Sequence, residues 1–530
     1  MAVTDVEEPR INYPAWTDYQ KKNGLDPLGM QNSSVNLYQT FLPGISNVTL
    51  RMRYYGLYAW LCRTYAQTDG SDDPERWKQF VRRAEALYAL IAVCAGGQGG
   101  VAGIQWAEKA YEYTQGDVID FASAADPNSE TKYLKQAWGA YGAAYGSQLF
   151  AIGIFWESPD HALPVPSSTF GDRLAQVFAD GLGALAPLFE EIILRGSVTR
   201  DELGRLTPIV PSEIGVTGNE RALYQEILLT PAEPEDADAL SRRLSLLLVL
   251  NIAGLLGREP DAEEVRWILY AGQGQEGRAL TLDAANLEAQ RQRWWVYQAN
   301  DLCHIALETL LKFTLDTLGP YSTGLTLARL IPLCIDRMLE SVDAVPASWT
   351  GLLETIHLAA NACSTNDANA EWSLCTEIMK GAGRRDESEC PPEIAWKAVL
   401  LLAVLHKRVR EEDHPVTAEL GRFTSDAFQT LLTESRFFDK HADLPIRTIL
   451  ARIIEQRVVR RHLWVAARKF QHGDYTFLIE SDEGRLRLRE KDGPVFTNPR
   501  LGPAITFLKD IHLLGGQGLT DYGAEAVSGA

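Results

Sequence analysis

Apolar residues recur at helical spacing almost without interruption between Ala239 and Phe438. Two of the longest helical spans are Ala239–Leu256 and Leu282–Leu318, and helix-ending pairs such as Gly319-Pro320 lie between the spans. No repeat of about 34 or 40 residues is visible, which argues against a solenoid of helical repeats. The sequence therefore predicts a mainly α, multi-domain helical protein.

The length of 530 residues exceeds what one hydrophobic core usually supports. Residues 1–30 are polar and contain several prolines, so we expect an extended arm there. We divide the chain into four parts: an N-terminal helical block with a candidate winged-helix-like end (1–190), a connecting region (191–238), a central helical domain (239–440) and a C-terminal winged-helix-like domain (441–530).

The ends and cysteines of the chain bear on its compartment. The first residues, MAVTDVEEPR, have neither a basic segment nor an apolar one, and no stretch reaches 18 uninterrupted apolar residues. The seven cysteines are scattered, and none forms a C-x-x-C pair. We expect a cytoplasmic protein with reduced thiols, without a membrane partner and without a metal or other cofactor.

The C-terminal stretch from Pro445 to Val527 combines helices with a short hairpin. A long helix is predicted at Ile446–Lys469, and two strands are predicted at Tyr475–Glu480 and Leu486–Arg489. The sequence FLKDIHLL, a Gly-rich turn and LTDYGAEAV follow, and this order resembles the end of a bacterial winged-helix domain. The resemblance implies a small α/β module at the C-terminus.

An internal echo predicts a second such unit in the N-terminal block, at 149–182. Leu149, Ile152, Ile154 and Phe155 have the same spacing as a later group. The later group is Leu508, Ile511, Leu513 and Leu514. A loop and a helix of small residues follow in both places, which predicts two related modules at either side of the helical block.

The predicted C-terminal helix carries a basic face. From Pro445 to Lys509 there are 13 Lys and Arg against 7 Asp and Glu, a net charge of +6 on a chain whose net charge is −19. A local basic segment on an acidic protein is typical of nucleic-acid contact. Helical spacing places four residues on one face of this helix: Arg457, Arg461, Trp464 and Arg468. The candidate nucleic-acid-binding residues are Arg457, Arg461, Trp464, Arg468, Lys469, Arg485 and Arg487. The alternative is that these cations pair with acidic helices of the same chain or with a protein.

A second candidate surface lies near the N-terminus, where Arg51, Arg53 and Tyr54 are close together in sequence. Interleaved Arg and Tyr can bind nucleic acid through charge and stacking. The alternative is a core helix whose hydroxyls are hydrogen-bonded. The surrounding segment, LPGISNVTLRMRYYGLYAWL, resembles uncharacterised bacterial proteins of phage-defence gene neighbourhoods. That resemblance implies an accessory role in defence and supplies no catalytic motif.

Catalytic patterns in the chain are weak. The spacing Arg-x4-His occurs at Arg436–His441 and at Arg457–His462, as in some helical RNases, but it recurs by chance in an Arg-rich chain. His304 and Glu308 share a helical face, so they could bind a metal, act as acid and base, or form a buried pair. Gly97-x-Gly99-x-x-Ala102 lacks the strand that a dinucleotide site needs. We assign no catalytic residue.

Three functions remain open at this point. The leading one is a non-enzymatic cytoplasmic bacterial protein that contacts duplex DNA, another nucleic acid or a partner subunit, as an accessory component of anti-phage defence. The second is a nuclease-type effector whose site is assembled from scattered residues. The third is a purely structural subunit, in a complex or a homo-oligomer.

Overall fold

The computed structural model describes residues 26–97, 99–157, 161, 163–384, 388–423, 428–471 and 475–529. Within these ranges the chain is mainly helical, and its named strands pair two by two in antiparallel ladders. The predicted mainly α fold class is confirmed. Most of the predicted arm, up to residue 25, lies outside the described residues, as does Gly473, where we expected the long C-terminal helix to break.

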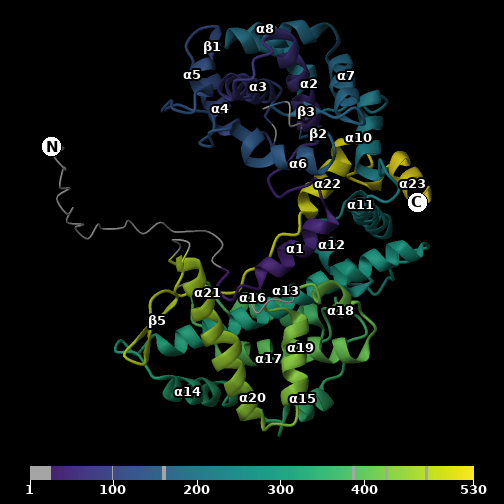
Figure 1. The fold of residues 1–530 in the computed structure, drawn as a ribbon. Helices are drawn as coiled ribbons and strands as arrows, with labels where there is room; N and C mark the ends of the chain where they lie inside the picture. The colour runs from purple at the N-terminus through teal and green to yellow at the C-terminus, as the bar shows by residue number, and fades with distance from the viewer. Residues whose placement is uncertain are drawn as a thin grey trace, which may run out of the picture.

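The helices form two lobes joined by a narrower junction (Figure 1). The N-terminal lobe is built from the elements between α2 and α10, with two short strand ladders at its surface. Its elements are α2 (Arg53–Thr68), α3 (Pro74–Cys94), α4 (Ile104–Tyr113), β1 (Val118–Asp120), α5 (Ala122–Ala125), η1 (Tyr141–Tyr145), α6 (Gly146–Ala151), β2 (Phe155–Trp156), β3 (Val165–Pro166), α7 (Gly171–Leu182), η2 (Gly183–Leu185), α8 (Ala186–Arg195), β4 (Ser197–Thr199), α9 (Arg200–Leu206), η3 (Thr207–Ile209) and α10 (Asn219–Leu229).

The C-terminal lobe is built around one long helix, α13 (Ala285–Leu318). From Trp294 to Leu318 every residue of α13 is buried, which is the pattern of a helix enclosed on all sides. The helices around it are α14 (Leu327–Leu339), α15 (Trp349–Thr355), α16 (Glu371–Gly381), α17 (Pro392–Glu411), α18 (Val416–Leu420), α19 (Leu431–His441), α20 (Ile446–Arg452), η4 (Ile453–Val459) and α21 (Arg460–Gln471), followed by the hairpin of β5 (Ile479–Asp482) and β6 (Arg485–Leu488).

The junction is made by elements from both ends and from the middle of the chain (Figure 1). It comprises α1 (Gln31–Phe41), α11 (Ala237–Leu256), α12 (Ala262–Ala271), α22 (Leu501–Asp510), β7 (Leu514–Gly515), β8 (Gly518–Leu519) and α23 (Asp521–Ser528). α1, α11 and α12 all pack on α13. At the other side, Phe507 of α22 packs edge-on against Tyr55 of α2. Both chain ends therefore hold the two lobes together.

The predicted C-terminal winged-helix-like domain does not assemble as one separate unit. α20 packs against α14, and η4 packs against α13, so this half of the segment belongs to the C-terminal lobe. α22 and β8 instead pack on α11, at the junction. Figure 1 shows the two halves of the segment apart, with α22 and α23 in yellow beside the N-terminal lobe. The helices of the two halves therefore pack on elements outside the segment rather than on each other.

The internal echo corresponds to a repeated backbone. In the first copy, α6, β2, β3 and α7 follow one another, and in the second copy the order is α22, β7, β8 and α23. Each first helix ends at a left-handed residue, Gly153 with φ 78° and His512 with φ 58°. The next amide then bonds back to the helix, from Ile154 to Leu149 at 2.9 Å and from Leu513 to the carbonyl of Leu508 at 2.8 Å.

The start of the second helix is also the same in the two copies. The hydroxyl of Thr520 donates to the carbonyl of His512, and it accepts from the amide of Gly523 at 3.2 Å. In the first copy the hydroxyl of Ser167 donates to Gly153 and accepts from Gly171 at 3.1 Å. The copies share a helix, a two-stranded ladder and a second helix whose start is bonded by a hydroxyl, although Thr520 is the N-cap of α23 and Ser167 lies three residues before the N-cap of α7. Their description as winged-helix modules remains a prediction.

α11 is the one helix in the described part of the chain that is long and apolar enough to cross a membrane. Most of its apolar window is buried inside the protein, and it packs against α10 and α13. Its composition is therefore accounted for by a core position between the lobes.

Candidate nucleic-acid interface

The long predicted C-terminal helix is present, but its middle is π-helical. α20, η4 and α21 run on from Ile446 to Gln471, and η4 includes Arg457. A π-helical turn departs from the 3.6-residue period, so it rotates the residues before it relative to those after it. Arg457 consequently faces α19, where its guanidinium pairs with the buried carboxylate of Glu434. The prediction that Arg457 belongs to the open basic face is wrong.

Arg461, Trp464 and Arg468 do lie together on α21. Each guanidinium lies over the indole ring of Trp464, with its central carbon 4.7 Å from the ring centroid. The indole is still 39% exposed. Burial, together with the neighbouring charge of Arg457, lowers the pKa of Arg461 to about 10. Crowded cations beside an exposed ring favour the approach of an anion that carries an aromatic group.

Sequence reasoning missed the exposed aromatic residues at the end of α21 and just after it. Phe470 is 56% exposed and Tyr475 is 44% exposed, and their rings pack edge-on at 5.8 Å. Phe477 packs against both. The signal was present as a run of aromatic residues between the basic helix and the hairpin. We define the basic–aromatic face as Arg461, Trp464, Arg468, Phe470, Tyr475 and Arg489.

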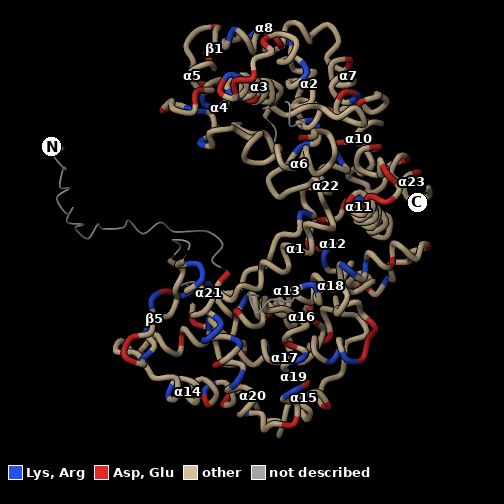
Figure 2. Tube along the Cα trace, viewed as in Figure 1, with Lys and Arg blue, Asp and Glu red and all other residues tan. Residues whose placement is uncertain are grey.

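The hairpin cations are less open than predicted. Arg485 donates to the carbonyl of Gly324 at 2.9 Å, and Arg487 pairs across the hairpin with Asp482 at 3.1 Å. Arg489, which was not predicted, lies 4.1 Å from the ring centroid of Tyr475 and bonds to Glu480. Lys469 donates to the main-chain carbonyl of Asp26 at 3.0 Å. Figure 2 shows basic residues along α21 and acidic residues toward the end of the hairpin.

The second candidate surface, Arg51, Arg53 and Tyr54, lies mostly inside the protein. Tyr54 is fully buried, and its hydroxyl accepts from the amide of Ala102 at 3.2 Å. Arg53 is also buried and pairs with Glu220 at 3.0 Å. Arg51 reaches Asp510 of α22 at 2.8 Å. The Arg and Tyr residues of this segment are core and junction residues, because each polar group has an internal partner that offsets its burial.

Neither Arg-x4-His pattern forms a catalytic pair. His462 is fully buried, its Nδ1 lies 3.1 Å from the carbonyl of Pro27, and its Nε2 accepts from the amide of Leu478 at 2.9 Å. Burial lowers the pKa of His462 to about 4, so the ring is neutral near pH 7. His441 faces Arg452, whose charge adds to the effect of burial and lowers the pKa of His441. His462 therefore has a structural role, and the side chain that hydrogen-bonds the ring of His441 is Arg452 and not Arg436.

Two other sequence features also have structural roles. The Gly-rich segment from Gly96 to Gly103 connects α3 to α4, with no strand before it, so the setting of a dinucleotide fingerprint is missing in the described part of this segment. All seven cysteines are free thiols, and six of them are buried.

No protein-family model, curated protein or solved structure matches the chain.

Proposed function

We propose that the protein is a non-enzymatic nucleic-acid-binding protein whose basic–aromatic face takes single-stranded nucleic acid. The observation that carries this proposal is the exposed indole of Trp464 between the guanidinium groups of Arg461 and Arg468. Nε of Arg461 donates to the carbonyl of Leu28 at 2.8 Å, so Arg468 is the guanidinium that can leave the ring and meet a phosphate, and a base can then stack on the exposed face of the indole. Phe470 and Tyr475 form a second pair of exposed rings where α21 ends and the chain leads to the hairpin.

The exposed rings favour a single strand over duplex DNA. Bases within a duplex are stacked on one another, so they offer no free face to a side chain, whereas an unpaired strand does. The acidic residues Asp482 and Glu483 near the turn of the hairpin oppose the entry of that turn into a duplex groove. The binding experiment described below therefore compares duplex DNA with single strands.

A second candidate function is the binding of a protein subunit. Trp, Tyr and Arg residues carry most of the binding energy at protein interfaces, and the same face displays all three. Such a partner would bind with a weaker dependence on salt than a nucleic acid, because fewer counterions would be released.

The first test measures the binding of fluorescently labelled single-stranded and duplex oligonucleotides by anisotropy at several salt concentrations. We expect Trp464→Ala to weaken single-strand binding by about 1–3 kcal/mol, and Arg468→Glu to weaken it and to reduce its salt dependence. Trp156→Ala and Arg447→Glu are matched controls, because both residues are exposed and lie on other elements. Both controls should bind as the wild type does.

Equal binding by the wild type and Trp464→Ala would contradict the proposal. A stoichiometric protein partner that is lost with Trp464→Ala, in the absence of oligonucleotide binding, would establish the alternative. The same samples test the nuclease-type function, because cleavage of the labelled strand that EDTA abolishes would make the protein an enzyme.

We further propose that the protein works in the bacterial cytoplasm as an accessory component of anti-phage defence, as the resemblance of Leu42–Leu61 implies. Support comes only from that resemblance and from the fit of a nucleic-acid-binding face to such a role. The test is a plaque assay in cells that carry the gene with its neighbours. Trp464→Ala should lower protection, whereas Trp156→Ala should not.

A further inference from the structure

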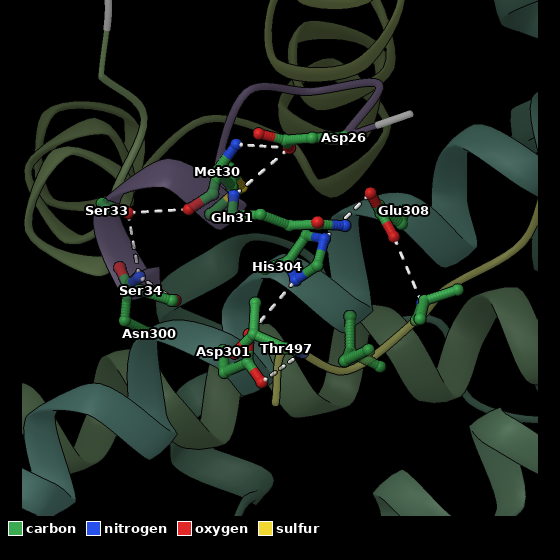
Figure 3. Close-up of polar contacts among 12 residues, drawn as sticks. Asp26, Met30, Gln31, Ser33, Ser34, Asn300, Asp301, His304, Glu308 and Thr497 are labelled. Atoms are coloured by element: carbon green, nitrogen blue, oxygen red, sulfur yellow. Dashed lines mark hydrogen bonds and ion pairs between the residues drawn. The ribbon is translucent and has the colours of Figure 1, made fainter. Parts of the chain in front are cut away.

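Three metal-binding side chains from distant parts of the chain meet inside the protein. Asp26 precedes α1, and His304 and Glu308 lie one turn apart on α13 (Figure 3). One ligand atom from each residue lies within 4.8 Å of the others. All three are buried: Asp26 is 6% exposed, Glu308 2% and His304 fully buried.

Several atoms of this cluster lack hydrogen-bond partners. Oδ2 of Asp26, Nε2 of His304 and Oε1 of Glu308 are buried and form no hydrogen bond. Nε2 of His304 and Oε1 of Glu308 face each other at 2.8 Å, as an ion pair if the ring is protonated. Oδ2 of Asp26 has no such partner among the described residues, and a buried carboxylate oxygen without a partner is costly, so a cation shared by the three atoms would offset that cost.

The other atoms of the same side chains are held in place. Nδ1 of His304 lies 3.4 Å from Oδ1 of Asp301, whose Oδ2 accepts from the amide of Thr497 at 3.1 Å. Oε2 of Glu308 accepts from the amide of Val495. Oδ1 of Asp26 accepts from the amides of Met30 and Gln31. A carboxylate behind a histidine is the usual support of a metal-bound imidazole, because it fixes the ring and its tautomer.

The charges around the cluster also favour a cation. Asp26, Asp301 and Glu308 place three carboxylates around one imidazole. Oδ1 of Asp301 lies 3.4 Å from Nδ1 of His304, whereas Oε1 of Glu308 lies 2.8 Å from Nε2, so carboxylates lie beside both ring nitrogens.

We propose that Asp26, His304 and Glu308 bind one divalent transition-metal ion, with Zn²⁺ as the preferred ion. Imidazole nitrogen and carboxylate oxygen are both ligands of Zn²⁺, and a solvent molecule completes the usual four positions. Mg²⁺ and Ca²⁺ fit less well, because they take oxygen ligands almost exclusively.

The cluster needs only a small rearrangement to hold the ion. Bonds of about 2.0–2.2 Å in a tetrahedral site separate the ligand atoms by about 3.3–3.6 Å. The 2.8 Å separation of His304 and Glu308 must open slightly, and the widest separation, within 4.8 Å, must close. Because the three side chains are almost fully buried, the ion has a structural role: it ties the start of α1 to α13.

The experiment uses the full chain without a histidine tag. We expect about one Zn²⁺ per chain by elemental analysis, and a lower melting temperature after EDTA treatment that Zn²⁺ restores and Mg²⁺ does not. Co²⁺ in place of Zn²⁺ should give the visible absorption of a four-coordinate site. Wild-type protein that contains no metal and gains no stability from Zn²⁺, Mn²⁺ or Co²⁺ would overturn the proposal without any variant.

The variants separate a metal site from a buried ion pair. Asp26→Asn leaves the His304–Glu308 pair intact but removes one ligand, so its affinity for Zn²⁺ should be at least about tenfold lower than that of the wild type. Asp301→Asn removes the carboxylate behind His304, and we expect a similar loss of Zn²⁺ affinity. His406→Gln is the matched control, because His406 is a buried histidine beside a single carboxylate, that of Asp439. An Asp26→Asn variant that binds Zn²⁺ with wild-type affinity would also overturn the proposal.

Discussion

Single buried polar residues fix the positions of whole segments in this protein. His462 is one example, because its two ring nitrogens join Pro27, in the segment that leads into α1, to Leu478, just before β5. Its Nε2 accepts a hydrogen from Leu478, so the neutral tautomer has its proton on Nδ1, which donates to Pro27. A protonated ring could not accept that bond, so protonation of His462 in the folded protein costs the hydrogen bond from Leu478.

The pH dependence of stability follows from this arrangement. The pKa of His462 is about 4 when folded and near 6.5 when unfolded, so the unfolded chain binds a proton first as the pH falls. The contribution to stability is complete above pH 6.5, and about 2–3 kcal/mol is lost by pH 4.5. Denaturant unfolding of the wild type and of His462→Gln at pH 7 and pH 4.5 measures this contribution to the free energy of unfolding. The difference between the two proteins should narrow at pH 4.5, and a constant difference would contradict the assignment.

At the scale of elements, the repeated helix–ladder–helix unit depends on one glycine in each copy. A side chain on Gly523 would clash with the carbonyl oxygen of Leu513, and one on Gly171 would clash with that of Ile154. Both glycines lie in the first turn of a helix that must pass close to the preceding strand. Close approach of two backbones, and not a special φ angle, is the reason that glycine is needed at these positions.

Substitution of these glycines tests the repeat directly. Gly523→Ala and Gly171→Ala should each lower the free energy of unfolding by about 1–3 kcal/mol, because the strand must move away from the helix. Gly516→Ala is the control, because nothing lies near the added atom in the β7–β8 turn. Urea unfolding checks all three, and equal stability of Gly516→Ala and Gly523→Ala would show that the close approach is absent.

Periodicity predicted the elements well and their assembly poorly. The helices predicted at Ala239–Leu256 and Leu282–Leu318 are present as α11 and α13, and the echo between 149–155 and 508–514 also follows from apolar spacing. The π-helical turn around Arg457 has no spacing signature, so the open face could not be predicted residue by residue. Asp26 lies far from His304 in sequence, and only the folded chain brings the two together. Local patterns cannot encode such distant contacts.

At the scale of the whole molecule, the two lobes are joined by a charged pair as well as by apolar packing. Arg51, just before α2, pairs with Asp510 at the end of α22, and Oδ2 of Asp510 also accepts from the amide of Met52 at 3.0 Å. Burial raises the pKa of Asp510 to about 6, although Arg51 opposes that shift. The pair is largely shielded from water, so its partners should be strongly coupled.

A double-mutant cycle measures that coupling. For Arg51→Ala and Asp510→Ala we expect a coupling energy of about 0.5–3 kcal/mol, from denaturant unfolding of the two single variants and the double variant. The control cycle uses Arg447 and Asp336, an ion pair whose side chains are both exposed, and we expect about 0–1 kcal/mol there. Equal coupling in the two cycles would mean that the Arg51–Asp510 pair adds nothing specific to the junction.

The position of α22 has a consequence for synthesis of the protein. The ring of Tyr55 and the amide of Met52 are covered by Phe507 and Asp510, which are translated more than 400 residues later. Until α22 has emerged from the ribosome, the side of the N-terminal lobe that contains Tyr55 is not covered by Phe507. Nascent chains that stop before residue 501 would keep it exposed, and chaperone binding or proteolysis is the expected fate of such products.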